Sequence, residues 1–389
     1  MLFLYIPVKG SSSDLPWSLI HMNESVTIYD SYVFDPLIPS KESVEILEQY
    51  LLDHKYDCLI SYLFVPEISD LCQKYNCKYV GWIYDSPLVS LFHPAVRNPC
   101  NYLFIFDRSE YEYFSKRGIP HLYYLPMATN TLRTGLLNIT AEDEQRYSCD
   151  ISFVGGLYET NTYNSLIGAL PEDIANEFKL YLLRNMCNWS QPKQWPRISE
   201  KAVLYMQQHF DTDKWNRMDM DTDLFLGIAL LSGKLAEIDR ITVLNTLAES
   251  FSVHLYTSGD SSFLQNVHVH PPVNYDTDMN KIFYLSKINL NITLPSIETG
   301  IPQRIFDIMG CGGFVMTNYQ KDLEEHFTIG TDLEVFHNPD ELKEKTTYYL
   351  QHEKERIQIA MNGYQKVREH FSYPHQLRQI LDLIKEDIT

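Results

Sequence analysis

A loop with glycine and proline directly before a short helix is the first segment of this sequence whose residue types could do chemistry. The loop Thr299-Gly300-Ile301-Pro302 precedes a helix predicted over Gln303–Met309. Backbone N–H groups at a helix start have no partner within the helix and carry partial positive charge. They therefore bind phosphate groups readily. The segment predicts an anion-binding site, with the neighbouring acid Glu298 at its edge.

Two charged side chains of this predicted helix extend that interpretation. Arg304, in the first turn, can add a charge-assisted contact to a phosphate oxygen. Asp307 lies three residues later on the same face and can accept hydrogen bonds from a ribose diol. The alternative is an ordinary surface ion pair between the two side chains. Spacing alone leaves both interpretations open.

Further candidates for binding an anion lie elsewhere in the same half of the chain. Gly155-Gly156 directly follow a strand candidate, and glycines there let a ligand approach the backbone. Arg240 opens an amphipathic helix and is a second cation that can reach a diphosphate. The competing interpretations are a merely tight turn and a solvent-exposed arginine.

One acid in the first half follows a strand candidate. Asp85 lies after the apolar run Tyr79–Tyr84, at a strand's carboxyl end, where a carboxylate can act as a general base on a hydroxyl group. A turn or helix cap formed by Asp85-Ser86-Pro87 is the alternative. His93 is a further candidate base, and a structural histidine is its alternative.

Short apolar strands that alternate with amphipathic helices must position these residues. Such alternation predicts parallel, doubly wound sheets. The first half contains strand candidates at Leu2–Pro7, Cys58–Tyr62, Tyr79–Tyr84, Tyr102–Phe106 and His121–Leu125, and helix candidates at Ser43–His54, Pro66–Tyr75 and Glu110–Arg117. The second half contains strand candidates at Asp150–Val154, Val253–Tyr256, Val267–Val269, Ile288–Asn291 and Gly313–Thr317.

A polar, acidic stretch, Leu136–Ser148, separates the two strand series, and 389 residues suit two domains. We therefore expect an α/β chain with Rossmann-like domains over 1–140 and 141–370. Residues from about 166 to 235 lack strand patterns and predict a helical insertion in the second domain. Residues 371–389 predict a final helix that can pack back on the first domain.

The overall composition limits the classes of partner and the cellular locations that we expect for this chain. The formal charge of −19 opposes general binding to nucleic acid. Seven scattered cysteines without ligand-pair spacing indicate reduced thiols and no metal site. The start MLFLYIPV lacks a basic region, and no apolar run is long enough to span a membrane. These features predict a cytoplasmic protein with no membrane span.

The segment Ser286–Thr317 resembles the glycosyltransferase group-1 signature, and specifically the CgeB-type (spore-maturation-protein-like) branch. The resembling residues are SKINLN, the G-I-P-x-R-x-F-D helix start and CGGFVMTN. The likeness continues through the C-terminal stretch Asp340–Tyr373, and GWIYDSPL, YLFIFDRS and YYLPMATN resemble the amino-terminal domain of this branch.

The resemblance implies a GT-B fold, with a nucleotide-sugar donor held mainly by the second domain and an acceptor, protein or glycan, by the first. It implies that Gly155, Gly156, Gly300, Ile301, Pro302 and Arg304 face the donor, and that Asp307 matches the second acid of a Glu-x7-Glu motif. The first acid of that motif would fall at Thr299, with Glu298 one residue early, so the stereochemistry stays open.

We therefore expect a metal-independent glycosyltransferase that uses a nucleotide sugar as co-substrate and no cofactor. The alternatives are a non-catalytic relative that binds a sugar or a partner, and an epimerase or hydrolase of nucleotide sugars on the same fold. The sequence leaves the sugar, the acceptor and the oligomeric state open.

Overall fold

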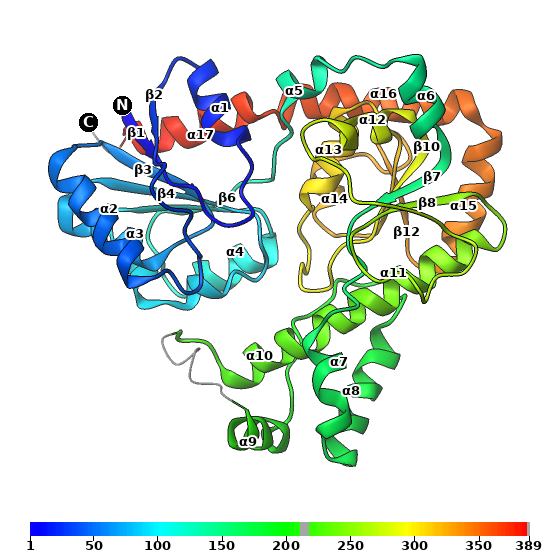
Figure 1. Ribbon diagram of the computed structural model, residues 1–389, viewed down its shortest axis with the longest axis horizontal. Coiled ribbons are helices and arrows are strands. Elements are labelled where there is room, and N and C mark those ends of the chain that lie inside the picture. Colours follow the sequence, from blue (N-terminus) through cyan, green and yellow to red (C-terminus); the bar gives the residue numbers. More distant parts are fainter. Residues whose placement is uncertain (211–217, 387–389) are drawn as a thin grey trace. The chain divides into compact units, whose positions relative to one another are not determined.

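The computed structural model describes residues 1–210 and 218–386, which form two compact units (Figure 1). The first unit comprises the described parts of 1–127, 211–220 and 371–389, and the second those of 128–210 and 221–370. Each unit contains one six-stranded sheet. The predicted α/β class with two doubly wound domains is confirmed.

The sheet of the first unit is parallel, with the strand order β2-β1-β3-β4-β5-β6. Strands β3 and β5 are buried along their whole length, as expected of a sheet with helices on both faces. The sequence missed only the edge strand β2, which is short and half-exposed. The strands are β1 (Leu2–Tyr5), β2 (Ser25–Ile28), β3 (Cys58–Tyr62), β4 (Lys78–Ile83), β5 (Asn101–Ile105) and β6 (Leu122–Tyr124).

Two groups of helices flank this sheet (Figure 1). Helix α1 packs on α17, and α2 packs on α3. The last helix therefore belongs to the first unit: its apolar face is buried, and the hydroxyl of Tyr373 lies 2.6 Å from that of Tyr62. The helices are α1 (Asp14–His21), α2 (Lys41–Asp53), α3 (Pro66–Tyr75), α4 (Arg108–Ser115) and α17 (Tyr373–Glu386), with short 3-10 turns η1 (Val89–Phe92) and η2 (Pro94–Arg97).

The sheet of the second unit is also parallel, with the order β12-β11-β10-β7-β8-β9. This is the Rossmann order, in which the direction of strand addition reverses between β7 and β10. Ligands of such sheets bind beyond the carboxyl ends of the strands at that point. The strands are β7 (Cys149–Val154), β8 (Val253–Tyr256), β9 (His268–His270), β10 (Ser286–Asn291), β11 (Val315–Asn318) and β12 (Glu334–Phe336), the last not predicted.

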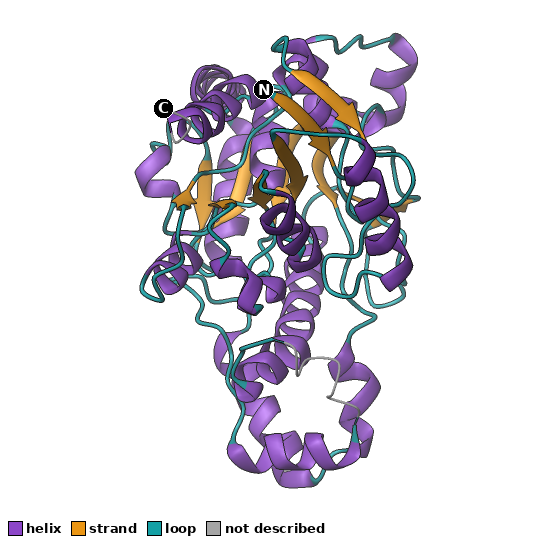
Figure 2. Ribbon diagram, turned by 90° about the vertical axis from the view of Figure 1, so that its left-hand side faces the viewer, coloured by secondary structure: helices purple, strands orange, loops and turns teal. Residues whose placement is uncertain are grey.

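Helices α6, α12, α13 and α16 pack as one group in this unit, and α11 packs on α15. A buried cluster that includes Phe153, Leu244, Ile288 and Phe336 fills the space around the strands. The helices are α5 (Thr131–Gly135), α6 (Ala141–Tyr147), α11 (Gly233–Ala248), α12 (Asp278–Leu285), α13 (Gln303–Gly310), α14 (Leu323–His326), α15 (Pro339–Gln351) and α16 (Glu353–His370). Figure 2 shows strands with helices on either side of them.

The division between the units falls at Met127–Ala128, earlier than the boundary near residue 140 that the polar stretch suggests. The physical reason is that residues after 127 pack on the second unit. The Ala128 carbonyl accepts a 2.6 Å hydrogen bond from Gln303, and Asp143 forms a 2.8 Å ion pair with Lys281. The acidic stretch is itself helical from Ala141, because Thr140 and Asp143 form a capping box.

The stretch predicted to be a helical insertion contains no strand among its described residues. Its helices form a separate group below α11 in Figure 1. They have a core of their own, with Phe178, Leu182, Met206 and Leu230 among its buried members. The helices are α7 (Thr162–Leu166), η3 (Ile167–Ala169), α8 (Glu172–Asn185), α9 (Glu200–His209) and α10 (Thr222–Gly227), and the π-helical turn η5 (Ile228–Ser232) joins α10 to α11.

Candidate functional site

The strongest candidate site lies at the reversal point of the second sheet, where Arg240 joins the ends of its two central strands. Strand β7 leads into Gly155-Gly156, and β10 leads into Ile292. Arg240 Nη1 donates a 2.5 Å hydrogen bond to the Gly156 carbonyl, and Nη2 donates a 2.9 Å bond to the Ile292 carbonyl. Helix α11 thus holds a guanidinium group at the edge of the sheet where nucleotides bind in Rossmann folds.

Arg240 forms no ion pair with a carboxylate in the described part of the chain, although the charge of the neighbouring Asp239 acts on it. Its Nε atom is buried without a hydrogen-bond partner there, and its guanidinium lies 4.7 Å from the ring of Tyr158. Burial lowers the pKa of Arg240 to about 10, and the charge of Arg304 contributes in the same direction. The group remains cationic at neutral pH, and it is half-buried rather than solvent-exposed. Such a cation is well suited to bind an anion.

The glycine pair lies beside this arginine. A Cβ atom added to Gly156 would meet no other atom within 4 Å, so the protein's own packing does not require glycine there. At Gly155 the added atom would make ordinary contacts, the nearest at 3.5 Å with Phe153. The space above Gly156 is therefore open to a ligand.

The first backbone N–H groups of helix α13 have no side-chain cap. Helix α13 starts at Gln303, as predicted. Its N-cap residue is Pro302, and no side chain there accepts a hydrogen bond from the first N–H groups of the helix. The loop itself is held in place, because the Thr299 carbonyl accepts a 3.0 Å bond from the amide of Asp322. Gly300 and Ile301 are buried in it. The first N–H groups of α13 can thus receive an anion.

Arg304 and Asp307 form the ion pair of the alternative interpretation, with 3.9 Å between Nη1 and Oδ2. Arg304 extends toward α12, where it contacts the Met279 sulfur and lies 5.4 Å from the Phe283 ring. The pair is not a surface pair, because Asp307 is only 2% exposed. Its Oδ1 atom accepts bonds from Gln303 (2.9 Å) and the Tyr275 hydroxyl (3.2 Å).

Two residues of this region were not predicted from the sequence. Trp195 donates a 2.6 Å bond from its backbone N–H to Glu298 and a 2.9 Å bond from its indole to the Ser296 carbonyl. The insertion therefore supports the loop that leads to α13. Asp239, next to Arg240, is fully buried, and burial raises its pKa to about 6. No sequence pattern signals either contact, since both depend on how the insertion folds.

In the first unit, Asp85 lies two residues after the last residue of β4, at the carboxyl edge of the sheet. Its side chain is exposed and has no hydrogen bond or ion pair with the rest of the described chain. Surrounding protein atoms nevertheless desolvate the carboxyl group and raise its pKa above the usual value. The expected alternative, a turn cap, would show a hydrogen bond to a backbone N–H group.

Two buried acids lie beneath this position and were not singled out from the sequence. Asp107 accepts a 2.8 Å bond from Ser86, and Glu110 accepts a 2.8 Å bond from the amide of Leu88. Burial, together with the charge of Asp107, raises the pKa of Glu110 well above its usual range. Asp107 lies two residues after strand β5, as Asp85 lies two residues after β4. This repeated position in the sequence could have identified Asp107 as a candidate.

His93 has a structural role in the first unit. It is the N-terminal capping residue of η2, and its Nδ1 atom accepts a 3.1 Å bond from the amide of Ala95. A histidine that accepts through Nδ1 carries its proton on Nε2. The ring therefore has only one nitrogen left for other contacts. The Nδ1 bond is what the structural interpretation of His93 predicts.

Residues 1–210 and 218–386 contain neither a candidate metal site nor a candidate membrane span. No group of three or more His, Cys, Asp or Glu side chains there is arranged to hold a metal ion. No helix in the same ranges is long and apolar enough to cross a membrane.

Comparison with known proteins supports the assignment of the fold. The described structure superposes on Alr3699/HepE from Anabaena in complex with UDP-glucose with a TM-score of 0.57 and 9% identity, over 99% of this chain and 100% of the other. A sucrose-phosphate synthase from Thermosynechococcus elongatus gives 0.57 and 10%, over 100% and 99%. A glycosyltransferase from Rickettsia africae gives 0.56 and 12%, over 100% and 98%. The fold is the predicted GT-B fold.

Sequence comparison gives one family. No curated protein matches the chain. Residues 240–382 match the family described as glycosyl transferase-like, and this match begins at Arg240 and includes the whole loop and helix α13. The predicted GT-B architecture is therefore confirmed, and residues 240–382 are similar to a glycosyl transferase-like family.

Proposed function

We propose that the chain transfers a sugar from a UDP-sugar to an acceptor hydroxyl group, and that Arg240 binds the diphosphate. The carrying observation is the unpaired guanidinium of Arg240 between the ends of β7 and β10. Support for UDP comes from similar structures of Alr3699/HepE and T4 phage BGT, which were determined with UDP-glucose. The sequence motifs further favour the CgeB-type branch.

In this proposal the diphosphate lies over Gly156, near Arg240 and the start of α13. The open space at Gly156 and the uncapped N–H groups of α13 support that position. These fixed positive groups would stabilise the nucleoside diphosphate as the bond between its oxygen and the sugar's anomeric carbon breaks. Positive charge from the protein would then replace a metal ion. The seven free cysteines support a reducing, cytoplasmic location.

The roles of the two α13 side chains follow from their contacts. Arg304 is a second cation. To reach a phosphate oxygen, its side chain would have to break the ion pair with Asp307. Asp307 would hold the ribose if a ribose hydroxyl replaced that of Tyr275, its 3.2 Å partner. Asp85 is the proposed base, because its carboxyl group is exposed and has no partner in the described chain. It would take the acceptor's hydroxyl proton as the new bond forms.

The test is Arg240→Gln. Losing a charge-assisted phosphate contact costs about 1.5–3 kcal/mol, which corresponds to a loss of roughly 10- to 150-fold in kcat/KM. Arg240→Lys keeps the charge and should retain part of that activity. Arg378→Gln, at an exposed position of α17, is the control and should leave the kinetics unchanged.

The assay also separates the alternatives. Release of free sugar without an acceptor product would indicate a hydrolase, and a changed sugar on the nucleotide would indicate an epimerase. Donor binding without any reaction would indicate the non-catalytic relative. Wild-type kcat/KM in a folded Arg240→Gln variant would refute the proposed phosphate contact.

A further inference from the structure

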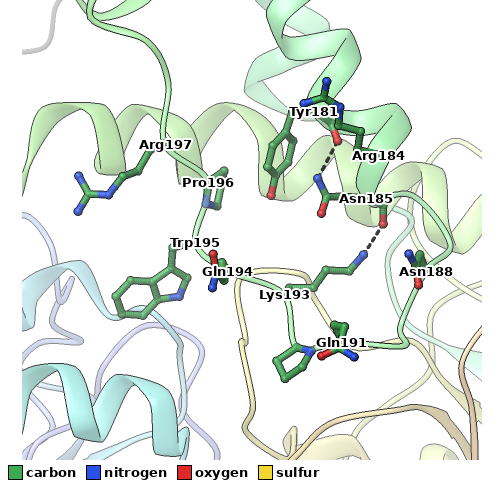
Figure 3. A pocket seen from close by; sticks show the side chains of 11 residues that line it. Tyr181, Arg184, Asn185, Asn188, Gln191, Lys193, Gln194, Trp195, Pro196 and Arg197 are labelled. Atoms are coloured by element: carbon green, nitrogen blue, oxygen red, sulfur yellow. Dashed lines mark hydrogen bonds between the residues drawn. The ribbon is translucent and has the colours of Figure 1, made fainter.

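A cavity of 610 Å³ lies in the insertion of the second unit, between helix α8 and the loop of residues 188–197 (Figure 3). Tyr181 and Asn185 project from α8 toward that loop, and Lys193 extends from the loop toward Asn185. The volume is within the range of small-molecule sites. None of the proposed donor-binding residues lines this cavity.

The loop that forms one wall is fixed at several points. The Trp189 amide donates a 2.9 Å bond to the His337 carbonyl, and its buried ring meets Phe336 edge-on at 5.3 Å. Trp195 is held by its bonds to Glu298 and the Ser296 carbonyl. A Cβ atom on Gly227 would overlap the Pro196 carbonyl, so α10 also packs closely on the loop. The cavity is therefore a built feature with defined walls.

The cavity lining is positively charged, whereas the whole chain has a net negative charge. Three cations line the cavity and no carboxylate does, although the chain has 51 acidic and 32 basic residues. Arg197 is neutralised by Asp221 and Asp223, at 2.9 and 2.8 Å. Arg184 has no hydrogen bond or ion pair within residues 1–210 and 218–386. An anion would therefore find at least one cation without a partner.

Lys193 adds a second positive charge to the lining. Its Nζ donates a hydrogen bond to the Asn185 carbonyl, and no carboxylate of the described chain pairs with it. Burial lowers the pKa of Lys193, because its ammonium group is partly removed from water, and the charge of Asp239 opposes this only in part. An acidic ligand would compensate for that loss.

The neutral part of the lining suits a sugar. The side-chain amides of Gln191 and Gln194 make no hydrogen bond with the described chain, and each can donate to and accept from hydroxyl groups. Trp195 and Tyr181 supply flat apolar faces that carry polar tips. We propose that this cavity binds a saccharide that carries a carboxylate or phosphate group, with the acid near Lys193 and Arg184.

The cavity also has a direct connection to the candidate donor site. Trp195 lines the cavity and binds Glu298, which precedes the loop at the start of α13. Assigning the acidic saccharide as the sugar acceptor rests on the proposed transferase function. The binding proposal itself does not, because it depends only on the lining residues.

The test is calorimetric titration of the full chain with glucuronic acid, glucose 6-phosphate, glucose and inorganic phosphate. At least one acidic sugar should bind about tenfold more tightly than glucose or inorganic phosphate. Arg184→Gln and Lys193→Gln should each weaken that binding about tenfold. Arg184 is exposed, so its variant tests the site even if Lys193→Gln fails to fold. Lys179→Gln, exposed on α8 outside the cavity, is the matched control and should bind as the wild type does.

Each outcome decides the proposal. Binding of only one acidic sugar supports it and identifies the acid as carboxylate or phosphate. Equal binding of glucose, equal binding of inorganic phosphate, absence of binding, or an Arg184→Gln variant of unchanged affinity overturns it. A chain that binds the acidic sugar but transfers no sugar would refute the proposed function and leave this site in place.

Discussion

At the scale of single residues, Gly156 is a glycine that the packing of the protein does not require but that ligand binding can require. Its carbonyl accepts the Arg240 bond, but no protein atom occupies the space of a side chain. If a phosphate group approaches this backbone, Gly156→Val should weaken donor affinity about tenfold or more, because the new side chain fills that space. The melting temperature should stay near that of the wild type.

The matched control for Gly156 is Gly168→Val, since an added Cβ there also meets no atom within 4 Å. Gly168 lies in the insertion, so its variant should bind the donor normally. Isothermal titration with UDP and thermal unfolding check both variants. Equal affinities of the two variants would show that the space above Gly156 is not used by the donor.

Asp85 is the residue on which turnover is expected to depend. Removing a general base typically lowers the rate by about 100- to 10,000-fold. Asp85→Asn should therefore lose transfer while donor affinity and melting temperature stay unchanged. Because desolvation raises the pKa of Asp85, the rate should increase with pH as the carboxyl group ionises above its usual range.

The control for Asp85 is Asp53→Asn, at the exposed end of α2. Steady-state rates of transfer across pH, compared between the two variants and the wild type, check this prediction. A lower melting temperature with normal turnover per folded molecule would instead identify Asp85 as a structural turn residue.

At the scale of elements, helix α11 carries a buried acid that should make stability depend on pH. Asp239 Oδ1 accepts a 2.6 Å bond from the Cys187 amide, and its other oxygen has no hydrogen-bond partner in the described chain. Burial raises its pKa from 3.8 to about 6. The folded state therefore holds a proton that the unfolded state releases as pH rises from 4 to 6, and stability falls over that window.

The size of this effect follows from the shift of about two pKa units, which corresponds to about 3 kcal/mol. Asp239→Asn should remove that part of the pH dependence, so the variant gains stability relative to the wild type between pH 4 and 6. Chemical unfolding at several pH values measures it. The exposed Asp382→Asn of α17 is the control. Parallel pH profiles for the wild type and Asp239→Asn would contradict the prediction.

At the scale of the whole molecule, a bound donor should stabilise the unit that holds it. A nucleotide at 100 times its dissociation constant adds about 2.7 kcal/mol to the free energy of unfolding. Since the described chain forms two compact units, the shift should appear in the transition of the second unit. Differential scanning calorimetry with UDP measures it, and Arg240→Gln should shift much less. A flat melting profile across UDP, GDP, dTDP and CMP would argue against donor binding.

Catalysis by the whole enzyme should also survive metal removal. Arg240, Arg304 and the start of α13 are proposed to supply the positive charge at the leaving diphosphate, which in other enzymes a metal ion provides. Transfer rates with EDTA should equal those without it, and added Mg²⁺ should change nothing. A strict requirement for Mg²⁺ or Mn²⁺ would contradict this expectation.

The sequence by itself determined the α/β class and the start of helix α13. It also placed ten of the twelve strands of the described chain close to their observed positions. These features are local, because apolar runs and glycine or proline before a helix have direct effects on nearby backbone. Strands β2 and β12 were missed because they are short edge strands whose burial depends on the rest of the sheet.

Tertiary structure alone decided which charged groups come together. Arg240 lies more than 50 residues from Ile292 in the chain, and their bond exists only because β7 and β10 are neighbours in the sheet. The boundary at Met127, the support of Glu298 by Trp195 and the burial of Asp239 likewise depend on contacts between distant segments. Local residue patterns specify the elements, whereas burial and charge environment arise when those elements pack.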